Sequence, residues 1–290
     1  MGDERVLTPA AAAARAALAG VDRVPGSRKS DPILQASGVR RDFGGITAVD
    51  VDHIEVQRGS ITALIGPNGA GKTTLFNLLT GFDTPNTGTW SFDGRSMEKV
   101  PPHRTAALGM VRTFQLTKSL TKLSVIENMR LGATDQRGEK WWNGLFAALW
   151  KSQEEANTTR AEALLERFKL SHMRDEYAGS LSGGQRKLLE MARALMTNPT
   201  LVMLDEPMAG VNPALKQSLN EHIRGLRDDG MTVLFVEHDM DMVHDISDWV
   251  IVMAEGRVIA EGTPDDISRN PAVIDAYLGA HQGRSLMEDQ

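Results

Sequence analysis

Short apolar runs alternate with amphipathic segments along most of this 290-residue chain. Four runs rich in β-branched and other large apolar residues are typical of buried strands: Ile61–Ile65, Leu201–Leu204, Thr232–Val236 and Trp249–Ala254. A segment with Leu75, Leu78 and Leu79 at helical spacing follows the first of them. Strands that alternate with helices predict an α/β fold.

Shorter patterns occupy the first third of the chain. Alternating residues predict strands at Ile33–Val39, His53–Val56, Gly88–Phe92 and Met110–Thr113. The pair Asp93–Gly94 is typical of a tight turn, and Pro101–Leu108 reads as a short helix.

The pattern becomes helical between residues 116 and 196. We expect helices at Ser124–Leu131, Trp141–Lys151, Glu154–Phe168 and Gly184–Met196. A helical block inserted into an α/β chain explains this best. Trp141, Trp142 and Trp150 stand on one apolar face, which forms either the core of the block or a partner-binding patch.

The two ends of the chain differ from its centre. Residues 1–32 include an alanine-rich stretch with little to bury, so we expect a flexible N-terminal extension, with a docking arm as the alternative. Beyond Gly262, residues 264–279 read as two short helices and 281–290 as disordered.

Composition and charge narrow the function. The net charge of −6 argues against a nucleic-acid partner, which usually needs a basic surface. The chain has no cysteine, so thiolate chemistry and disulfides are excluded. No apolar stretch reaches membrane-spanning length and the start is acidic, so we expect a cytoplasmic protein.

The candidate chemistry is concentrated after the first buried strand. The spacing G-x-x-x-x-G-K-T predicts a phosphate-binding loop, in which backbone N–H groups and a lysine bind phosphates and a threonine binds Mg²⁺. The expected ATP-binding residues here are Gly66, Pro67, Asn68, Gly69, Ala70, Gly71, Lys72, Thr73 and Thr74.

Of two further motifs, one supplies a pair of carboxylates and the other is expected to bind an anion. Asp205 and Glu206 end an apolar strand, where the first suits the Mg²⁺ shell and the second suits a general base. The sequence LSGGQ precedes a helix, and its polar and glycine residues predict a second anion site: Ser182, Gly183, Gly184 and Gln185. Because the first loop already serves a phosphate, the second suggests a phosphate presented by another subunit.

Three single residues complete the candidate site. His238 follows a strand and is a candidate γ-phosphate contact, and Gln115 could contact Mg²⁺ or the attacking water. Phe43, in a glycine-bearing turn, is either a stacking platform for the nucleobase or a core residue.

In this order, the motifs from Phe43 to His238 resemble an ATP-binding-cassette ATPase over about residues 33–262. The resemblance implies a P-loop NTPase (RecA-like) core at 33–115 and 197–262, with an antiparallel β portion. It further implies a helical subdomain at 116–196, a tail at 263–290 and a head-to-tail dimer around two Mg-ATP molecules. In such a dimer the nucleotide of the partner is contacted by Ser182, Gly184 and Gln185. The general base is Glu206, and phosphate is bound by Lys72 and His238. The expected Mg²⁺ contacts are Thr73, Gln115 and Asp205.

The loop after the acidic pair departs from the usual family pattern and indicates a narrower resemblance. The family usually has Ser-Ala-Leu-Asp there, and this chain has Ala209–Asn212, which removes a charge that serves communication across the dimer. That loop, the stretch 124–133 and the tail at 276–279 are similar to the ATPase subunit of branched-chain amino-acid importers. Urea or amide importers and lipopolysaccharide exporters are the alternatives within the family.

The resemblance also implies partners and a location. We expect transmembrane permease subunits near Leu116–Ser124, a second like or unlike cassette, and indirectly a solute-binding protein, on the cytoplasmic face of the membrane. One rival is a soluble cassette ATPase that acts on DNA or ribosomes. A purely regulatory cassette is disfavoured because Glu206 and His238 are both present.

Overall fold

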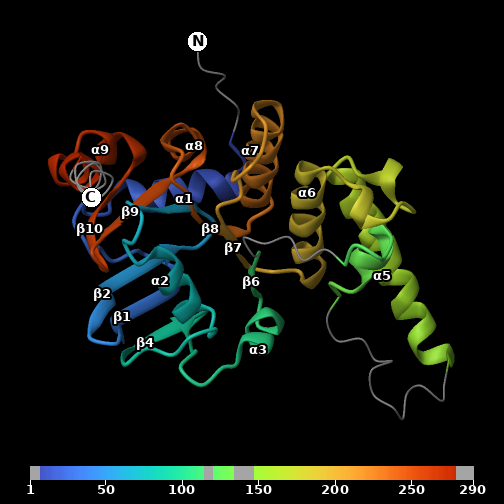
Figure 1. The fold of residues 1–290 in the computed structure, drawn as a ribbon, viewed down its shortest axis with the longest axis horizontal. Helices are drawn as coiled ribbons and strands as arrows, with labels where there is room; N and C mark the ends of the chain where they lie inside the picture. Colours follow the sequence, from blue (N-terminus) through green and yellow to red (C-terminus); the bar gives the residue numbers. More distant parts are fainter. Residues whose placement is uncertain (1–6, 114–119, 134–146, 279–290) are drawn as a thin grey trace, which may run out of the picture.

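The computed structural model describes residues 7–113, 120–133 and 147–278. Its centre is a six-stranded sheet in the order β10-β9-β3-β8-β7-β6, drawn in Figure 1. The strands β6 to β9 and β3 run parallel, and β10 pairs antiparallel with β9. Their bounds are β3 Ile61–Ile65, β6 Met110–Arg112, β7 Leu201–Asp205, β8 Thr232–Val236, β9 Trp249–Ala254 and β10 Arg257–Gly262. Three of these strands confirm the predicted ranges, whereas β10 was not predicted.

A second sheet of four antiparallel strands has the order β2-β1-β4-β5. It consists of β1 Pro32–Phe43, β2 Ile46–Gln57, β4 Thr87–Phe92 and β5 Arg95–Ser96. The turn between the last two strands is the predicted one, because Asp93 and Gly94 both have positive φ angles, 49° and 72°. The mixed α/β fold class is confirmed, including its antiparallel portion.

Helices surround the central sheet and form a separate block. Around the sheets lie α2 Lys72–Leu79, α3 Pro102–Ala107, α7 Pro213–Asp228, α8 Met240–Ile246 and α9 Pro264–Ser268. A further helical segment covers 271–278, so the tail holds the two short helices expected from the sequence. Within the described ranges, no helix is both long and apolar enough to cross a bilayer.

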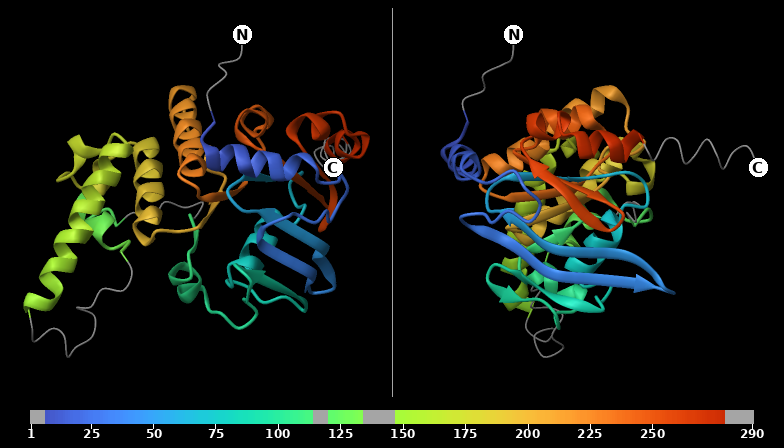
Figure 2. Two further views of the ribbon diagram at one scale, coloured as in Figure 1. Left: turned by 180° about the vertical axis from the view of Figure 1, so that it is seen from behind. Right: turned by 90° about the vertical axis from the view of Figure 1, so that its left-hand side faces the viewer.

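The helical block stands beside the sheets, as Figure 2 shows. It contains α4 Val125–Arg130, α5 Ala147–Arg167 and α6 Gly183–Ala194, with short 3-10 turns at Ser171–Met173, Ala178–Ser180 and Leu195–Thr197. The predicted break between two helices near residue 153 is wrong. The sequence there contains neither glycine nor proline, so nothing interrupts α5. Trp141 and Trp142 lie outside the described residues, and the description of Trp150 does not extend to its side chain.

The expectation of a flexible extension is wrong for the described part of residues 1–32. Pro9–Ala19 forms α1, capped by the Thr8 side chain, and contacts α7 and β2. Ala11, Ala14 and Leu18 are buried in that contact. The alanines that offered little to bury are small enough to let the helix backbone approach the core closely, which is why they favour packing here.

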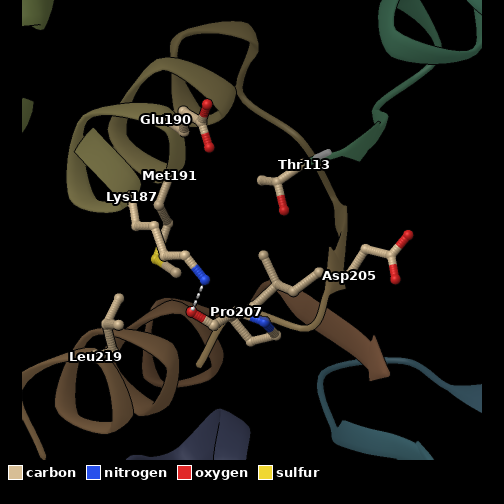
Figure 3. Close-up of a pocket in the computed structure, with 8 residues that line it drawn as sticks. Thr113, Lys187, Glu190, Met191, Asp205, Pro207 and Leu219 are labelled. Carbon is tan, nitrogen blue, oxygen red and sulfur yellow. Dashed lines mark hydrogen bonds between the residues drawn. The ribbon is translucent and has the colours of Figure 1, made fainter. Parts of the chain in front are cut away.

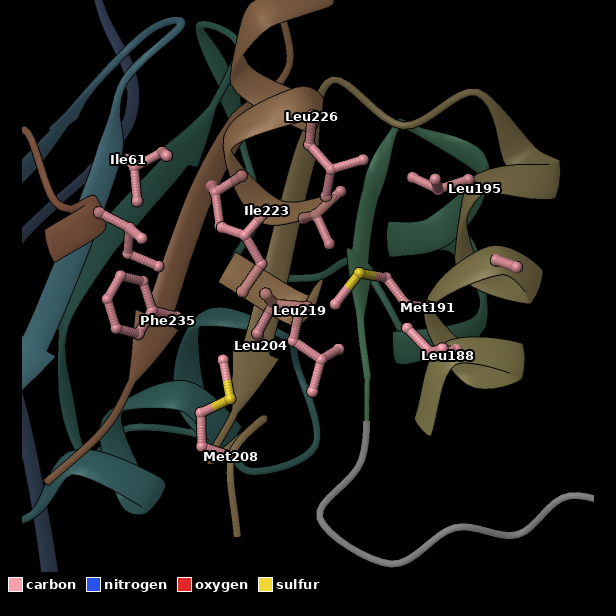
Figure 4. Close-up of a cluster of buried hydrophobic side chains, with 14 of the residues drawn as sticks. Ile61, Leu188, Met191, Leu195, Leu204, Met208, Leu219, Ile223, Leu226 and Phe235 are labelled. Atoms are coloured by element: carbon pink, nitrogen blue, oxygen red, sulfur yellow. The ribbon is translucent and has the colours of Figure 1, made fainter. Parts of the chain in front are cut away.

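The core is split by the central sheet into two apolar clusters. Alternate residues of each strand face opposite sides: Val202 and Leu204 belong to one cluster and Leu201 and Met203 to the other. The second cluster joins the sheet to α2 and the antiparallel sheet. The first continues through α7 into α6, as Figure 4 shows. Packing therefore links the position of α6 to the central sheet.

Candidate functional site

The predicted phosphate loop connects β3 to α2. Its glycines Gly66, Gly69 and Gly71 have φ angles of 150°, 81° and 96°. A Cβ on Gly66 would lie 2.0 Å from the carbonyl oxygen of Met253, and a Cβ on Gly71 would lie 2.3 Å from that of Ala48. Only glycine combines this backbone geometry with these close approaches. The pattern read from the sequence thus reflects a real steric requirement.

Lys72 opens α2 and turns back over the loop. Its Nζ donates to the carbonyl oxygens of Gly66, at 2.7 Å, and Pro67, at 2.9 Å. Burial lowers the pKa of Lys72, and the nearby carboxylates Glu206 and Asp205 oppose that shift. The lysine of the loop and the acidic pair at the end of β7 therefore face the same space.

Asp205 is held by a residue that the motif search did not assign. The guanidinium of Arg112, at the end of β6, donates to Asp205 Oδ2 at 2.6 Å and to Asn77 Oδ1 of α2 at 2.7 Å. Both side chains of the Arg112–Asp205 pair are buried. The other oxygen, Asp205 Oδ1, is buried without a hydrogen-bond partner among the described residues. One buried, unsatisfied carboxylate oxygen beside the phosphate loop fits a Mg²⁺ shell.

Glu206 follows directly and has an unusual backbone. Its φ angle is +45°, in the left-handed region that a glutamate rarely adopts. Its N–H donates to the carbonyl oxygen of Val236 at 3.0 Å, so the turn is fixed to the end of β8. Strained residues persist only where the surrounding structure holds them, and they concentrate at functional sites. Asp93, Lys169, Asn198 and Glu255 also have positive φ angles, so the strain at Glu206 supports its role only together with its place at the end of β7.

His238 reaches the same edge of the sheet from β8. Val236 is the register partner of Asp205, so the residues after these two strands are neighbours. The side chain of His238 is 64% exposed, whereas that of Glu237 is buried. Glu237 accepts from the backbone N–H groups of Met208 and His238, at 2.8 and 3.1 Å. It thereby binds the turn after Glu206 to the segment that presents His238.

Phe43 stands at the tip of the hairpin between β1 and β2. It is 46% exposed, which excludes the core interpretation. The guanidinium of Arg41 covers one face of the ring, with 4.5 Å from Cζ to the ring centroid. Ala48, further along β2, contacts the phosphate loop at Gly71, so the hairpin adjoins that loop. An exposed ring face beside a phosphate loop suits stacking on a nucleobase.

The LSGGQ residues begin α6. Ser182 caps the helix by accepting from the N–H of Gln185, and the Gln185 side chain accepts from the N–H of Ser182. Gly184 lies against Leu215 of α7, where a Cβ would meet the leucine side chain at 1.7 Å. This helix packs with α4 and α5, and Figure 1 shows it apart from α2. The two predicted anion sites of one chain thus do not form one pocket.

The unusual loop after the acidic pair ends in a helix cap. The Asn212 side chain accepts from the N–H of Leu215 at 2.9 Å, and proline follows at the first position of α7. Asparagine therefore serves as a local cap without a charge. Gln115 lies outside the described residues, so its expected contact with Mg²⁺ stays a prediction. Sequence reasoning had no signal for Arg112, because its role depends on a partner 93 residues away.

A pocket beside this site is lined by residues of β7, α6 and α7 and by Thr113 at the end of β6 (Figure 3). Thr113 and Asp205 come from the ends of β6 and β7, and Lys187 and Glu190 come from α6. Burial raises the pKa of Glu190 to about 7, against the opposing charges of Arg193, Lys187 and Arg186. The pocket lies between α6, the helix that follows LSGGQ, and β7, the strand that carries the acidic pair.

Comparison with known proteins agrees with this geometry. A family model described as "ABC transporter" matches residues 49–209. The chain belongs to the ATP-binding-cassette transporter family. The family assignment and the P-loop ATPase fold inferred from the motifs are confirmed. A second model, for "Branched-chain amino acid ATP-binding cassette transporter", matches residues 257–282 of this cassette.

Relatives resemble this cassette over most of its length. It is 44% identical over 248 residues to the probable branched-chain amino acid transport ATP-binding protein LivG of Archaeoglobus fulgidus, covering 86% of this chain and 96% of the relative. It is 42% identical over 253 residues to the high-affinity branched-chain amino acid transport ATP-binding protein BraF of Pseudomonas aeruginosa, covering 86% and 99%. A crystal structure of a nucleotide-free ATP-binding cassette from an ABC transporter has 39% identity and a TM-score of 0.74, covering 85% and 98%. A crystal structure of the ADP conformation of an ATP-binding cassette of an ABC transporter has 38% identity and the same TM-score, covering 86% and 100%.

Proposed function

We propose that this cassette is the ATP-hydrolysing motor subunit of an importer for branched-chain or related hydrophobic amino acids. The similarity to branched-chain amino acid transport ATP-binding proteins carries this proposal, because it extends over 86% of the chain. The tail at 257–282, matched by the model named for that transport class, supports it independently of the catalytic motifs. The alternatives within the family, urea or amide import and lipopolysaccharide export, are not favoured by these relatives.

In the proposed reaction, ATP binds along the phosphate loop. The loop N–H groups and Lys72 bind the phosphates, and the free ring face of Phe43 stacks on adenine. Glu206 orients the attacking water and accepts its proton, and His238 contacts the γ-phosphate. Mg²⁺, when bound, neutralises charge on the phosphates. Thr73, Gln115 and Asp205 Oδ1 would hold it.

The position of the LSGGQ segment supports a head-to-tail dimer. Ser182 and Gly183 are exposed at the start of α6, away from the phosphate loop of the same chain. The N–H groups and the positive end of a helix attract phosphate, so this segment suits the nucleotide bound by a second cassette, like or unlike. In the proposed cycle, closure around two ATP molecules moves permease subunits. These subunits receive the solute from a solute-binding protein. The cassette would then be peripheral, on the cytoplasmic face of the membrane.

The direct test of the reaction is Glu206→Gln. This change keeps the shape of the side chain but removes the base, so ATP binding should persist while turnover falls by about 10²–10⁴-fold. Steady-state phosphate release and equilibrium binding of ATP measure the two separately. Glu155→Gln, at an exposed position of α5, is the matched control and should have no effect. Full turnover by Glu206→Gln would refute the assignment of the base.

The transport role needs a separate experiment. The tagged chain is captured from detergent-solubilised membranes, and the co-purifying proteins are identified by mass spectrometry. Two multi-span permeases and a second cassette would support the importer. Ribosomal or DNA-repair partners without any membrane protein would overturn it in favour of a soluble cassette ATPase.

A further inference from the structure

A lysine of α6 reaches across to the turn that carries Glu206. Lys187 is on α6, and its Nζ donates to the carbonyl oxygen of Pro207 at 2.9 Å and to that of Glu206 at 3.3 Å. Figure 3 shows this side chain extending from α6 toward Pro207. These two carbonyls belong to the peptide groups that directly follow the Glu206 Cα, so the lysine restrains the backbone from which that side chain projects.

The restrained backbone is one that needs support. Glu206 has a φ angle of +45°, a conformation that costs a non-glycine residue of order 1 kcal/mol and persists only where neighbours hold it. On its N-terminal side, the N–H of Glu206 is bound to Val236 of β8. On its C-terminal side, Glu237 accepts from the N–H of Met208. Lys187 binds the two carbonyls between these anchors, and among the three it alone comes from the helical block.

Charge explains why a lysine suits this position. Burial lowers the pKa of Lys187, and three carboxylates oppose the shift: Glu237 from the end of β8, Glu190 from α6 and Glu206 itself. Carbonyl oxygens and surrounding carboxylates together stabilise an ammonium group in a half-buried pocket. A neutral side chain of the same length would fill the space but could not donate to both carbonyls.

We propose that Lys187 is a positioning residue for the catalytic base, which makes the geometry of Glu206 depend on the position of α6. The proposal rests on the role proposed above for Glu206. It also has a consequence for the dimer. The same helix begins with Ser182, only five residues before Lys187, so a phosphate bound at the helix start would restrain the lysine as well. Occupation of the partner's nucleotide site would thereby be transmitted to the base of this chain's own site.

The test removes the N–H donors of Lys187 and keeps a side chain of similar size. Lys187→Met should lower kcat for ATP hydrolysis by up to about 10²-fold, because displacing a catalytic group by about 1 Å costs that much. KM and ATP binding should change little, since the phosphate loop is untouched. Lys187→Arg restores the donors and should recover most of the lost kcat. Lys99→Met, the same change at an exposed position, is the control. The full-length chain is assayed, within its captured complex if the chain alone does not hydrolyse ATP.

A double variant separates this proposal from the one on which it rests. If Lys187 acts through Glu206, adding Lys187→Met to Glu206→Gln should cause no further loss of single-turnover hydrolysis. Independent, multiplying losses would overturn the positioning role and leave the base intact. Unchanged kcat in Lys187→Met, with Glu206→Gln inactive, would do the same. Full activity of Glu206→Gln would instead overturn the base itself. Should Lys187→Met lower the melting temperature, Lys187→Leu, which also lacks a donor, replaces it in the same comparisons.

Discussion

A buried ion pair joins the segment before β1 to β10, and it can be broken selectively. Lys29 and Glu261, 232 residues apart, are joined at 2.5 Å from Nζ to Oε2, with both side chains at most 1% exposed. The ammonium also donates to the carbonyl oxygen of Ser27 and lies 5.0 Å from the ring centroid of Trp249. Burial lowers the pKa of Lys29, and its pairing with Glu261 opposes this shift. The perturbation is Lys29→Met, which keeps the side-chain bulk and removes the charge.

The size of the expected destabilisation follows from the Glu261 carboxylate, which Lys29→Met leaves buried without its cation. Among the described residues, the buried Glu261 carboxylate would keep two neutral donors, the N–H of Ser27 at 2.6 Å and Trp249 Nε1 at 2.9 Å. Removing one member of a buried ion pair costs about 3–5 kcal/mol, and the lost cation–π contact adds about 1 kcal/mol. Methionine recovers part of this through apolar packing. We therefore expect the free energy of unfolding to fall by about 3–4 kcal/mol.

The assay is urea unfolding at neutral pH, followed by tryptophan fluorescence. The double variant Lys29→Met with Glu261→Gln keeps an acceptor for the two donors but removes the stranded charge. It should therefore be more stable than Lys29→Met alone. Lys99→Met again controls for the chemical change at an exposed site. A loss below about 1 kcal/mol in Lys29→Met, or a double variant no more stable than the single one, would refute the reasoning.

Two further outcomes are expected. Because burial raises the pKa of Glu190 from 4.5 to about 7, its contribution to stability is complete below pH 4.5 and is lost as the pH rises through 7. As the pH rises from 4.5 to 8, the free energy of unfolding of Glu190→Gln should therefore increase by about 1–3 kcal/mol relative to the wild type, after allowance for partial exposure. Urea unfolding at each pH measures this, and parallel pH profiles of the two proteins would contradict it. Phe43→Ala should weaken ATP binding about tenfold in titration calorimetry, while Phe43→Tyr should not; equal loss in both would exclude stacking.

Local patterns in the sequence were sufficient for the parallel strands of the central sheet and for the phosphate loop. The strands Thr232–Val236 and Trp249–Ala254 match their predicted ranges, because a strand buried on both faces is a continuous apolar run. The glycines of the loop were recognisable because steric limits at Gly66 and Gly71 permit no other residue. The atoms that exclude a side chain there belong to Met253 and Ala48, so the spacing of the glycines reveals the requirement but not the distant contacts behind it.

Other features depended on partners that are distant in sequence. The alanine-rich segment at Pro9–Ala19 has a weak pattern, and it is ordered only because α7 and β2 cover it. Strand β10 was missed because its pairing with β9 decides its conformation. The break predicted near residue 153 was wrong for a local reason, because no glycine or proline interrupts α5 there.

The sequence by itself determined the α/β class, the family and the types of residue at the nucleotide site. Only the tertiary structure decided which charges meet: Arg112 with Asp205, Lys29 with Glu261, and Lys187 with the turn after Glu206. The physical reason is range. A hydrogen bond or ion pair requires atoms within about 3 Å in space, and separation along the chain carries no information about that distance.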